Sequence, residues 1–315
     1  MRKDYLKLSN IIKNKRDSFL DISKGIAIIL VILGHSFPES TPTSGFQSFL
    51  FYIIYLCHMP IFFFISGYLS YGYLDRNKQI NKYAQKFLIL YFFSNLFFVP
   101  IMIFSANYSI NNFWKIFIGQ PVYGMTWFIY VHFLLIISTY FFITKKNLNV
   151  VLIIFIIFSL FLRLNVIQIN LGILKYIVYY GLFYFLGIFF KVQKYDLKII
   201  SKKFNFILSL ILFLSVGYLF YQIDKSPIFL SLLGMILIFK GAIYLEKNKV
   251  RFIEEIGSSS LWYYICHGFI IIFPRQFFWD SMKISYWFSF VLIFCVTFFS
   301  ISLLIILKNK FRSFR

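Results

Sequence analysis

The amino-acid sequence predicts an all-α integral membrane protein, a bundle of about ten transmembrane helices with both termini in the cytoplasm. Sixty per cent of the 315 residues are apolar and only 14% are charged, a composition that water-soluble domains of this length do not have. Several stretches also lack charge over close to the roughly 20 residues that cross a hydrocarbon core. Apolar residues follow one another within them, whereas the strands of a membrane barrel alternate apolar and polar positions. These observations favour helices.

Ten stretches have the length and apolarity of a membrane-spanning helix, which satisfies its backbone hydrogen bonds internally. The predicted spans are 19–37, 47–73, 85–105, 124–143, 148–163, 174–190, 205–221, 228–244, 259–273 and 285–307. The longest connections, near 106–123 and 191–204, are too short for a soluble domain. We therefore expect residues 1–315 to form one transmembrane domain, with residues 1–18 as a basic cytoplasmic tail.

Positive charge alternates from one connection to the next. When the five residues at each end of a span are counted with the adjoining connection, the two tails and the even-numbered connections hold 25 of the 32 lysines and arginines, the odd-numbered connections hold six, and Lys24 lies deeper within the first span. Cytoplasmic loops carry an excess of lysine and arginine, so this pattern predicts an even number of spans and cytoplasmic termini. The net charge of +21 is attributed to loops that face anionic lipid, and no nucleic-acid partner is expected.

The first span carries an unusual set of ionisable residues. Asp17, Asp21, Lys24 and His35 lie within about 60° of one another at 100° per residue, so they share one face, and Lys24 and His35 are about 16 Å apart along the axis. Ionisable side chains are costly inside a membrane and usually functional. The structural alternatives are a helix cap for Asp17 and His35 and an interfacial position for Lys24. Function is the favoured interpretation for His35.

The remaining histidines, His58, His132 and His267, also fall at middle to outer depth of their spans. Neutral imidazole is the least costly titratable group at such depth, and it suits general-base chemistry near neutral pH. Each is equally able to form interhelical hydrogen bonds, which is the interpretation favoured for His132. Pro60 and Gly67 mark an expected bend in the second span. The three cysteines lack metal-ligand spacing, so no metal is expected.

Two segments resemble the acyltransferase-3 family of membrane proteins. Within residues 16–36, Lys24 and His35 meet the family spacing of a basic residue, ten residues and a histidine. Residues 58–69, which read HMPIFFFISGYL, are similar to its second-helix signature, especially in the sugar O-acetylase branch. Weaker similarities follow at 126–128, 184–187 and 256–267, so the resemblance spans nearly the whole chain.

The sequence also departs from the family pattern. Lys24 stands where arginine is commoner, and Lys82 and Lys86 with Leu90-Tyr91 replace a frequent double-arginine stretch and proline. The resemblance nevertheless implies a ten-helix enzyme of the cell membrane (inner or plasma membrane), a multi-pass acyltransferase. Such proteins move an acyl group, usually acetyl from acetyl-CoA, to a hydroxyl of a cell-surface glycan or lipid-linked saccharide. The implied partners are acyl-CoA, that saccharide and membrane lipids.

The resemblance implies a role for each site residue. His35 is expected to be the general base that deprotonates the acceptor hydroxyl. Lys24, with Arg16 and Lys86, is expected to hold the CoA phosphates, and Asp21 to fix Lys24 by pairing with it.

Three further residues complete the expected site. His58 is expected to polarise the thioester carbonyl or orient the acceptor, and His267 and Trp127 to bind the acceptor. A covalent acyl-histidine relay is an alternative to direct transfer. The competing functions are a glycan-precursor transporter or flippase, which would show inverted repeats not evident here, and a receptor or structural membrane protein.

Overall fold

The computed structural model describes residues 17–39, 41–42, 45–74, 80–104, 110–122, 124–163 and 172–313, and this part of the chain contains helices and no strand. Each of the ten predicted spans coincides with a helical segment. The ten main helices are α2 (Ser18–His35), α3 (Gly45–Ser70), α4 (Ile80–Phe104), α5 (Trp127–Phe142), α6 (Leu148–Arg163), α7 (Ile173–Val192), α9 (Phe206–Gln222), α10 (Ile228–Lys247), α12 (Ser260–Ile270) and α14 (Tyr286–Ser313).

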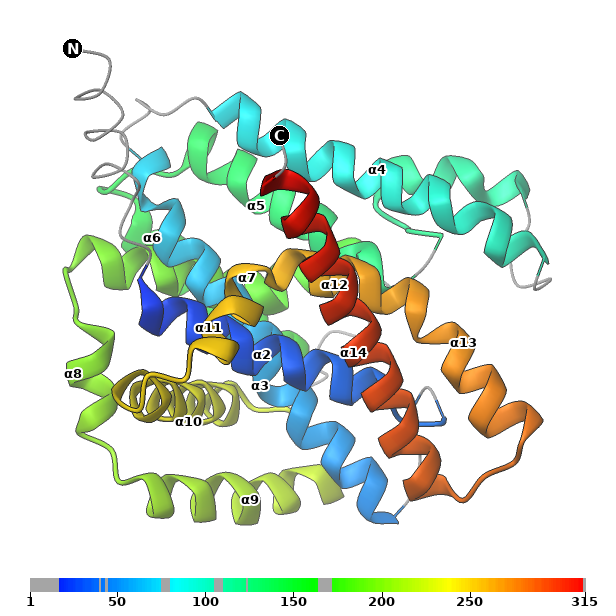
Figure 1. Cartoon of the computed structure of the whole chain (residues 1–315). Coiled ribbons are helices and arrows are strands. Elements are labelled where there is room, and N and C mark those ends of the chain that lie inside the picture. The colour runs from blue at the N-terminus through cyan, green and yellow to red at the C-terminus, as the bar shows by residue number, and fades with distance from the viewer. Residues whose placement is uncertain are drawn as a thin grey trace.

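Short helical elements connect these helices. They are η1 (Tyr71–Tyr73), η2 (Ile110–Ile118), η3 (Gly124–Thr126), α8 (Leu197–Lys202), α11 (Arg251–Ser258), α13 (Ile272–Arg275) and η4 (Gln276–Ser281), the last a π-helix. In Figure 1, α2, α3 and α7 occupy the middle of the molecule, with α4 along the upper edge and α9 along the lower. Helix α10 is viewed nearly along its axis, so the helices cross at different tilts.

Several helices are suited to crossing a bilayer. Six of those described are long and apolar enough to do so alone. Helix α11 and residues 260–281 together form a seventh candidate, bent by 76° at Ser259, and α4, α6 and α9 carry shorter apolar stretches. The all-α, multi-pass membrane fold is therefore confirmed, whereas ten crossings and cytoplasmic termini stay predictions.

Glycines bring α3 and α7 into backbone contact. A Cβ added to Gly67 of α3 would collide with the carbonyl oxygen of Tyr184, and one added to Gly187 of α7 would collide with that of Phe64. Small residues permit this close approach between membrane helices. Helix α3 continues through Pro60 as one helix, so Gly67 marks a helix contact, not a break in the helix.

A second reciprocal glycine contact joins α2 to α11. A Cβ on Gly25 would collide with the Ile253 carbonyl oxygen, and one on Gly257 with that of Asp21. This contact holds the first half of α2, which bears Asp21 and Lys24, directly against the bent segment. Asp21 and Lys24 therefore lie in a tightly packed part of the fold.

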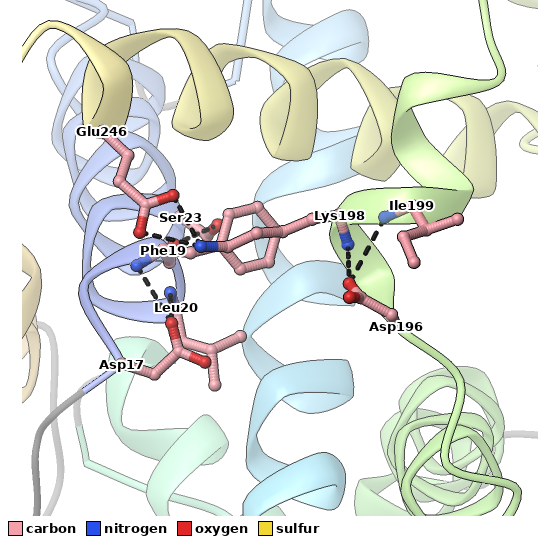
Figure 2. A network of polar contacts seen from close by, with 8 residues as sticks. All are labelled: Asp17, Phe19, Leu20, Ser23, Asp196, Lys198, Ile199 and Glu246. Carbon is pink, nitrogen blue, oxygen red and sulfur yellow. Dashed lines mark hydrogen bonds and ion pairs between the residues drawn. The ribbon is translucent and has the colours of Figure 1, made fainter.

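Polar contacts join connections that the charge pattern assigns to one side of the membrane. Figure 2 shows Lys198 of α8 beside Phe19 of α2 and paired with Glu246 of α10. The Lys198 Nζ to Glu246 Oε2 distance is 2.7 Å, and the Asp196 carboxylate caps α8 by accepting from the backbone N–H of Lys198. Lys145 lies 5.2 Å from the ring centroid of Tyr71. These contacts agree with the shared side that the sequence predicts.

Candidate active site

Helix α2 begins with a carboxylate cap and an ion pair. Asp17 is the N-cap, and its carboxylate accepts hydrogen bonds from the backbone N–H groups of Phe19 and Leu20. One turn later, Lys24 Nζ lies 2.6 Å from Asp21 Oδ1. The Asp21 side chain is 7% exposed and that of Lys24 is 21% exposed. Asp17 thus has the capping position that the structural alternative foresaw, and the expected pair of Asp21 with Lys24 is present.

A cavity of about 110 Å³ lies beside Lys24 and is lined by residues of five helices. Its lining residues are Lys24 of α2, Phe62 and Ser66 of α3, Phe87 of α4, Phe128 and His132 of α5, and Ser260, Leu261 and Tyr264 of α12. This lining is mostly apolar, with a cation, an imidazole and three hydroxyls. A cavity of this composition fits a narrow chain that carries a few polar groups.

Three histidines meet at the far end of α2, about 16 Å from Lys24 along the helix axis. The ring of His35 lies 5.2 Å from the ring of His267, centroid to centroid. The hydroxyl of Tyr55 is 3.4 Å from each ring nitrogen of His35. The Tyr55 ring also meets the ring of His58 edge-on, at 4.7 Å. Residues from α2, α3 and α12 therefore form one group, the histidine cluster of His35, Tyr55, His58 and His267.

The histidine cluster is tightly enclosed. His58 and His267 are buried, while His35 is partly exposed. His58 Nδ1 lies 2.6 Å from the carbonyl oxygen of Ile54, which orients its ring. Among the described residues, His267 Nε2 is buried without a hydrogen-bond partner. Buried polar atoms in proteins are nearly always hydrogen-bonded, so this nitrogen is an exception within the cluster.

Arg275 ties the end of α2 to α13. Its Nη2 atom donates hydrogen bonds to the carbonyl oxygens of His35 and Phe37. Carbonyl groups at a helix C-terminus lack helical partners and favour a cation. Arg275 therefore fixes the backbone that carries His35.

Helix α12 links the cavity to the histidine cluster. Its residues Ser260, Leu261 and Tyr264 line the cavity, and His267 follows Tyr264 after about one turn. The Tyr264 ring lies 5.5 Å from the His267 ring, and the Tyr264 hydroxyl donates to the carbonyl oxygen of Met125. The Asp21–Lys24 pair, the cavity and the histidine cluster therefore follow one another in that order through the helix bundle.

Other predicted site residues lie outside this arrangement. Lys86 is exposed on α4, beside the cavity residue Phe87. Trp127 stacks on Tyr176 and Tyr180, with ring centroids 4.3 and 5.2 Å away. Arg16 lies outside the described residues.

Sequence reasoning missed the two tyrosines of the site. Tyr55 and Tyr264 each stand three residues before a histidine, in the matching segments YLCH (55–58) and YICH (264–267). Residues three apart on a helix are neighbours, so this repeated spacing is the signal that could have found them. No sequence pattern pointed to Arg275, because it lies 240 residues from its hydrogen-bond partner His35 in the sequence.

Buried histidines near an internal cavity of a helical membrane bundle suit a membrane-embedded group-transfer enzyme. Residues 17–307 match the acyltransferase-3 family, described as an acyltransferase domain. Because the match covers most of the chain, the protein belongs to this family. It is a multi-pass membrane acyltransferase.

Short segments of curated proteins are also similar. Nodulation protein NolL of Sinorhizobium fredii is 44% identical over 66 residues, which cover 20% of this chain and 18% of that protein. Nodulation protein NolL of Mesorhizobium japonicum is 45% identical over 67 residues, with the same two shares. The matched segment thus spans less than a fifth of either relative. No solved structure matches this chain.

Proposed function

We propose that this protein transfers an acetyl or another short acyl group from acyl-CoA to a hydroxyl of a cell-surface glycan or lipid-linked saccharide in the cell membrane. The observation that supports this most is the cavity between the Asp21–Lys24 pair and the histidine cluster. The family match supports acyl transfer as the class of reaction. The donor, the acceptor and the residue roles are part of the proposal.

Acyl-CoA approaches from the side that bears Lys24, which the charge pattern assigns to the cytoplasm. The partly exposed ammonium of Lys24 binds a donor phosphate, and Asp21 holds that ammonium in position. Arg16 and the exposed Lys86 add positive charge that attracts the nucleotide. The thioester arm then extends through the cavity toward the histidine cluster.

His35 acts as the general base in this proposal. Its imidazole takes the proton of the acceptor hydroxyl while the hydroxyl oxygen bonds to the acyl carbon. The carbon–sulfur bond of the thioester then breaks, and the CoA sulfur leaves with the proton that His35 held. His267 Nδ1 donates to the carbonyl oxygen of Tyr263, at 3.3 Å, so Nε2 of the neutral ring is an acceptor. This Nε2, which lacks a protein partner in the described part of the chain, accepts a hydrogen bond from a hydroxyl of the acceptor saccharide and orients it.

The remaining predicted residues have supporting roles. Tyr55 contacts both His35 and His58, so it positions the base, and His58 braces that tyrosine. The aromatic ring of Trp127 binds the acceptor saccharide. The role of His58 follows from its contact with Tyr55, and that of Trp127 from the family resemblance.

Purified protein incubated with labelled acetyl-CoA tests this function. The expected result is release of CoA and transfer of label to saccharide acceptor, with loss of both in a His35→Ala variant. A glycan-precursor transporter or a receptor would consume no acetyl-CoA. Absence of acetyl-CoA turnover by the folded wild-type protein, with acceptor present, would overturn the proposal.

A further inference from the structure

A groove of about 630 Å³ lies along α10, and we call it the α10 groove. It is formed where α10 meets the ends of α8 and α9, which lie beside it (Figure 1). Its lining residues are Lys202 of α8, Phe206 of α9, and Lys240, Gly241, Ile243, Tyr244 and Lys247 of α10. The cavity beside Lys24 has none of these residues in its walls. The α10 groove is therefore separate from the proposed path of the acyl donor.

Three lysines line the α10 groove, and its described lining includes no acidic residue. Lys202 and Lys247 are exposed and Lys240 is partly exposed, so all three side chains are accessible. Within the described part of the chain, none of these side chains has an ion pair or a hydrogen bond. Like charges gathered in one place repel one another. The groove therefore favours a ligand that brings negative charge.

The position of Lys240 places this charge at the depth of lipid headgroups. Lys240 and Lys247 are seven residues apart, so they share one face of α10, and Lys240 lies about 10 Å inside the end of the helix. Helix α10 is long and apolar enough to cross a membrane. A lysine at such a depth keeps its stem among apolar groups and extends its ammonium toward the headgroups. The charge pattern assigns this end of α10 to the cytoplasm, and the cytoplasmic leaflet carries anionic lipid.

Apolar side chains form the rest of the α10 groove. Phe206 is 48% exposed and Tyr244 is 68% exposed, although both are large hydrophobic residues. Tyrosine is common at membrane interfaces, where its ring contacts acyl chains and its hydroxyl reaches polar groups. A small soluble anion would use the lysines and leave this apolar surface uncovered. A ligand with an anionic head and hydrocarbon chains covers both.

We propose that the α10 groove is a binding site for an anionic phospholipid of the cytoplasmic leaflet. The lipid phosphate lies among the three lysines, and an acyl chain lies against the rings of Phe206 and Tyr244. Basic pockets between membrane helices on the cytoplasmic side recognise acidic headgroups in this way. The site adds a lipid partner to the proposed function and does not depend on acyl transfer.

The bound lipid connects helices that support the candidate active site. Lys202 belongs to α8 and Lys240 to α10, so one headgroup bridges the two helices. Helix α10 packs in turn against α2, where the rings of Phe239 and Phe19 are 5.4 Å apart. A ligand that binds only the folded protein stabilises it. Anionic lipid should therefore raise the unfolding temperature of the protein in detergent more than zwitterionic lipid does.

Native mass spectrometry of the detergent-solubilised full chain tests the site. The protein is titrated with phosphatidylglycerol or with phosphatidylcholine that carries the same acyl chains. We expect phosphatidylglycerol to bind more tightly, and Lys240→Gln to weaken it about fivefold without changing phosphatidylcholine binding. Lys240→Arg should retain the affinity. Lys146→Gln is the matched control, because Lys146 is an exposed lysine on the same predicted side and lies outside the groove.

A second variant and a soluble competitor complete the test. Lys247→Gln, at the exposed end of α10, should repeat the selective loss of phosphatidylglycerol. Glycerol 1-phosphate, which has the phosphate without acyl chains, should displace the lipid only at far higher concentration. Equal affinity of the wild-type protein for the two lipids would overturn the proposal. So would equal phosphatidylglycerol binding by Lys146→Gln and both groove variants, or displacement by glycerol 1-phosphate at the concentration of the lipid itself.

Discussion

At the residue scale, the ionisable groups of α2 divide into two sets with different surroundings. Asp21 and Lys24 pair at 2.6 Å at one end, and His35 joins other aromatic rings at the opposite end. Helical spacing predicted that these residues share one face, and the pairing of Asp21 with Lys24 was expected from the family resemblance. Only the family resemblance placed His58 and His267 in one site with His35, because that grouping depends on how three distant helices pack.

Replacing Lys24 tests the donor end of the site. Lys24→Ala should raise the KM for acetyl-CoA about ten- to hundredfold, because a charge-assisted hydrogen bond contributes about 1.5–3 kcal/mol. Lys24→Arg keeps the charge and should restore most of the affinity. Steady-state kinetics on purified protein measures both, with Lys202→Ala as a control because Lys202 is an exposed lysine on the same predicted side. An unchanged KM for Lys24→Ala would contradict phosphate binding by Lys24.

Replacing Arg275 tests the support of His35. Arg275 donates to two carbonyl oxygens at the end of α2, so Arg275→Met should loosen the backbone that carries the base. We expect the turnover number to fall at least about tenfold, because small misplacements of a catalytic group are costly, with the KM for acetyl-CoA little changed. Arg275→Lys, which retains the charge, should recover part of that loss. A normal turnover number for Arg275→Met would show that His35 does not depend on this contact.

At the element scale, the fold depends on helices held close by glycine. The pairs α3 with α7 and α2 with α11 each meet through two glycines whose added Cβ atoms would strike backbone carbonyls. Pro60 and Gly67 were expected to mark a bend; α3 continues past both as one helix, and the bend stays a prediction. The bounds of the predicted spans and of the observed helices are otherwise close; for example, the span predicted at 148–163 is helix α6. The 76° break near Ser259 was not predicted. The spans were predicted from hydrophobicity averaged over many residues, and a short run of glycine and serine changes that average little.

Glycine substitution tests the contact between α3 and α7. Gly67→Ala and Gly187→Ala should each destabilise the protein by about 1–3 kcal/mol, because backbone atoms have little freedom to move aside. Gly124→Ala is the matched control, since no atom lies within 4 Å of its added Cβ. Thermal unfolding in detergent compares the variants. Unaltered stability of both helix-contact variants would contradict the close packing described.

At the scale of the whole molecule, the charge pattern and the contacts between connections agree. Lys198 pairs with Glu246, and Arg163 donates to the Ser226 carbonyl at 2.6 Å; in both pairs the partners come from connections predicted to share a side. The sequence could thus indicate where the helices lie and which connections lie together, since both follow from composition and charge. It could not indicate the cavity, because five helices distant in sequence build its walls.

Cysteine labelling tests the sidedness. In a background without the three native cysteines, Lys283→Cys should react with an impermeant maleimide in intact cells. Lys202→Cys, also at an exposed position, should react only after the membrane is opened. Both positions lie in polar connections, so accessibility should report the side and not burial. Labelling of both from the same side would contradict an even number of spans with cytoplasmic termini.

Acyl transfer to a surface saccharide depends, in the proposed function, on His35. Mass analysis of surface glycans measures this transfer in cells that lack the chain and carry either the wild-type protein or His35→Ala at equal membrane level. We predict that the deletion removes an acyl group from the glycan, that the wild-type protein restores it, and that His35→Ala does not. Full acyl content in cells that carry only His35→Ala would contradict the account.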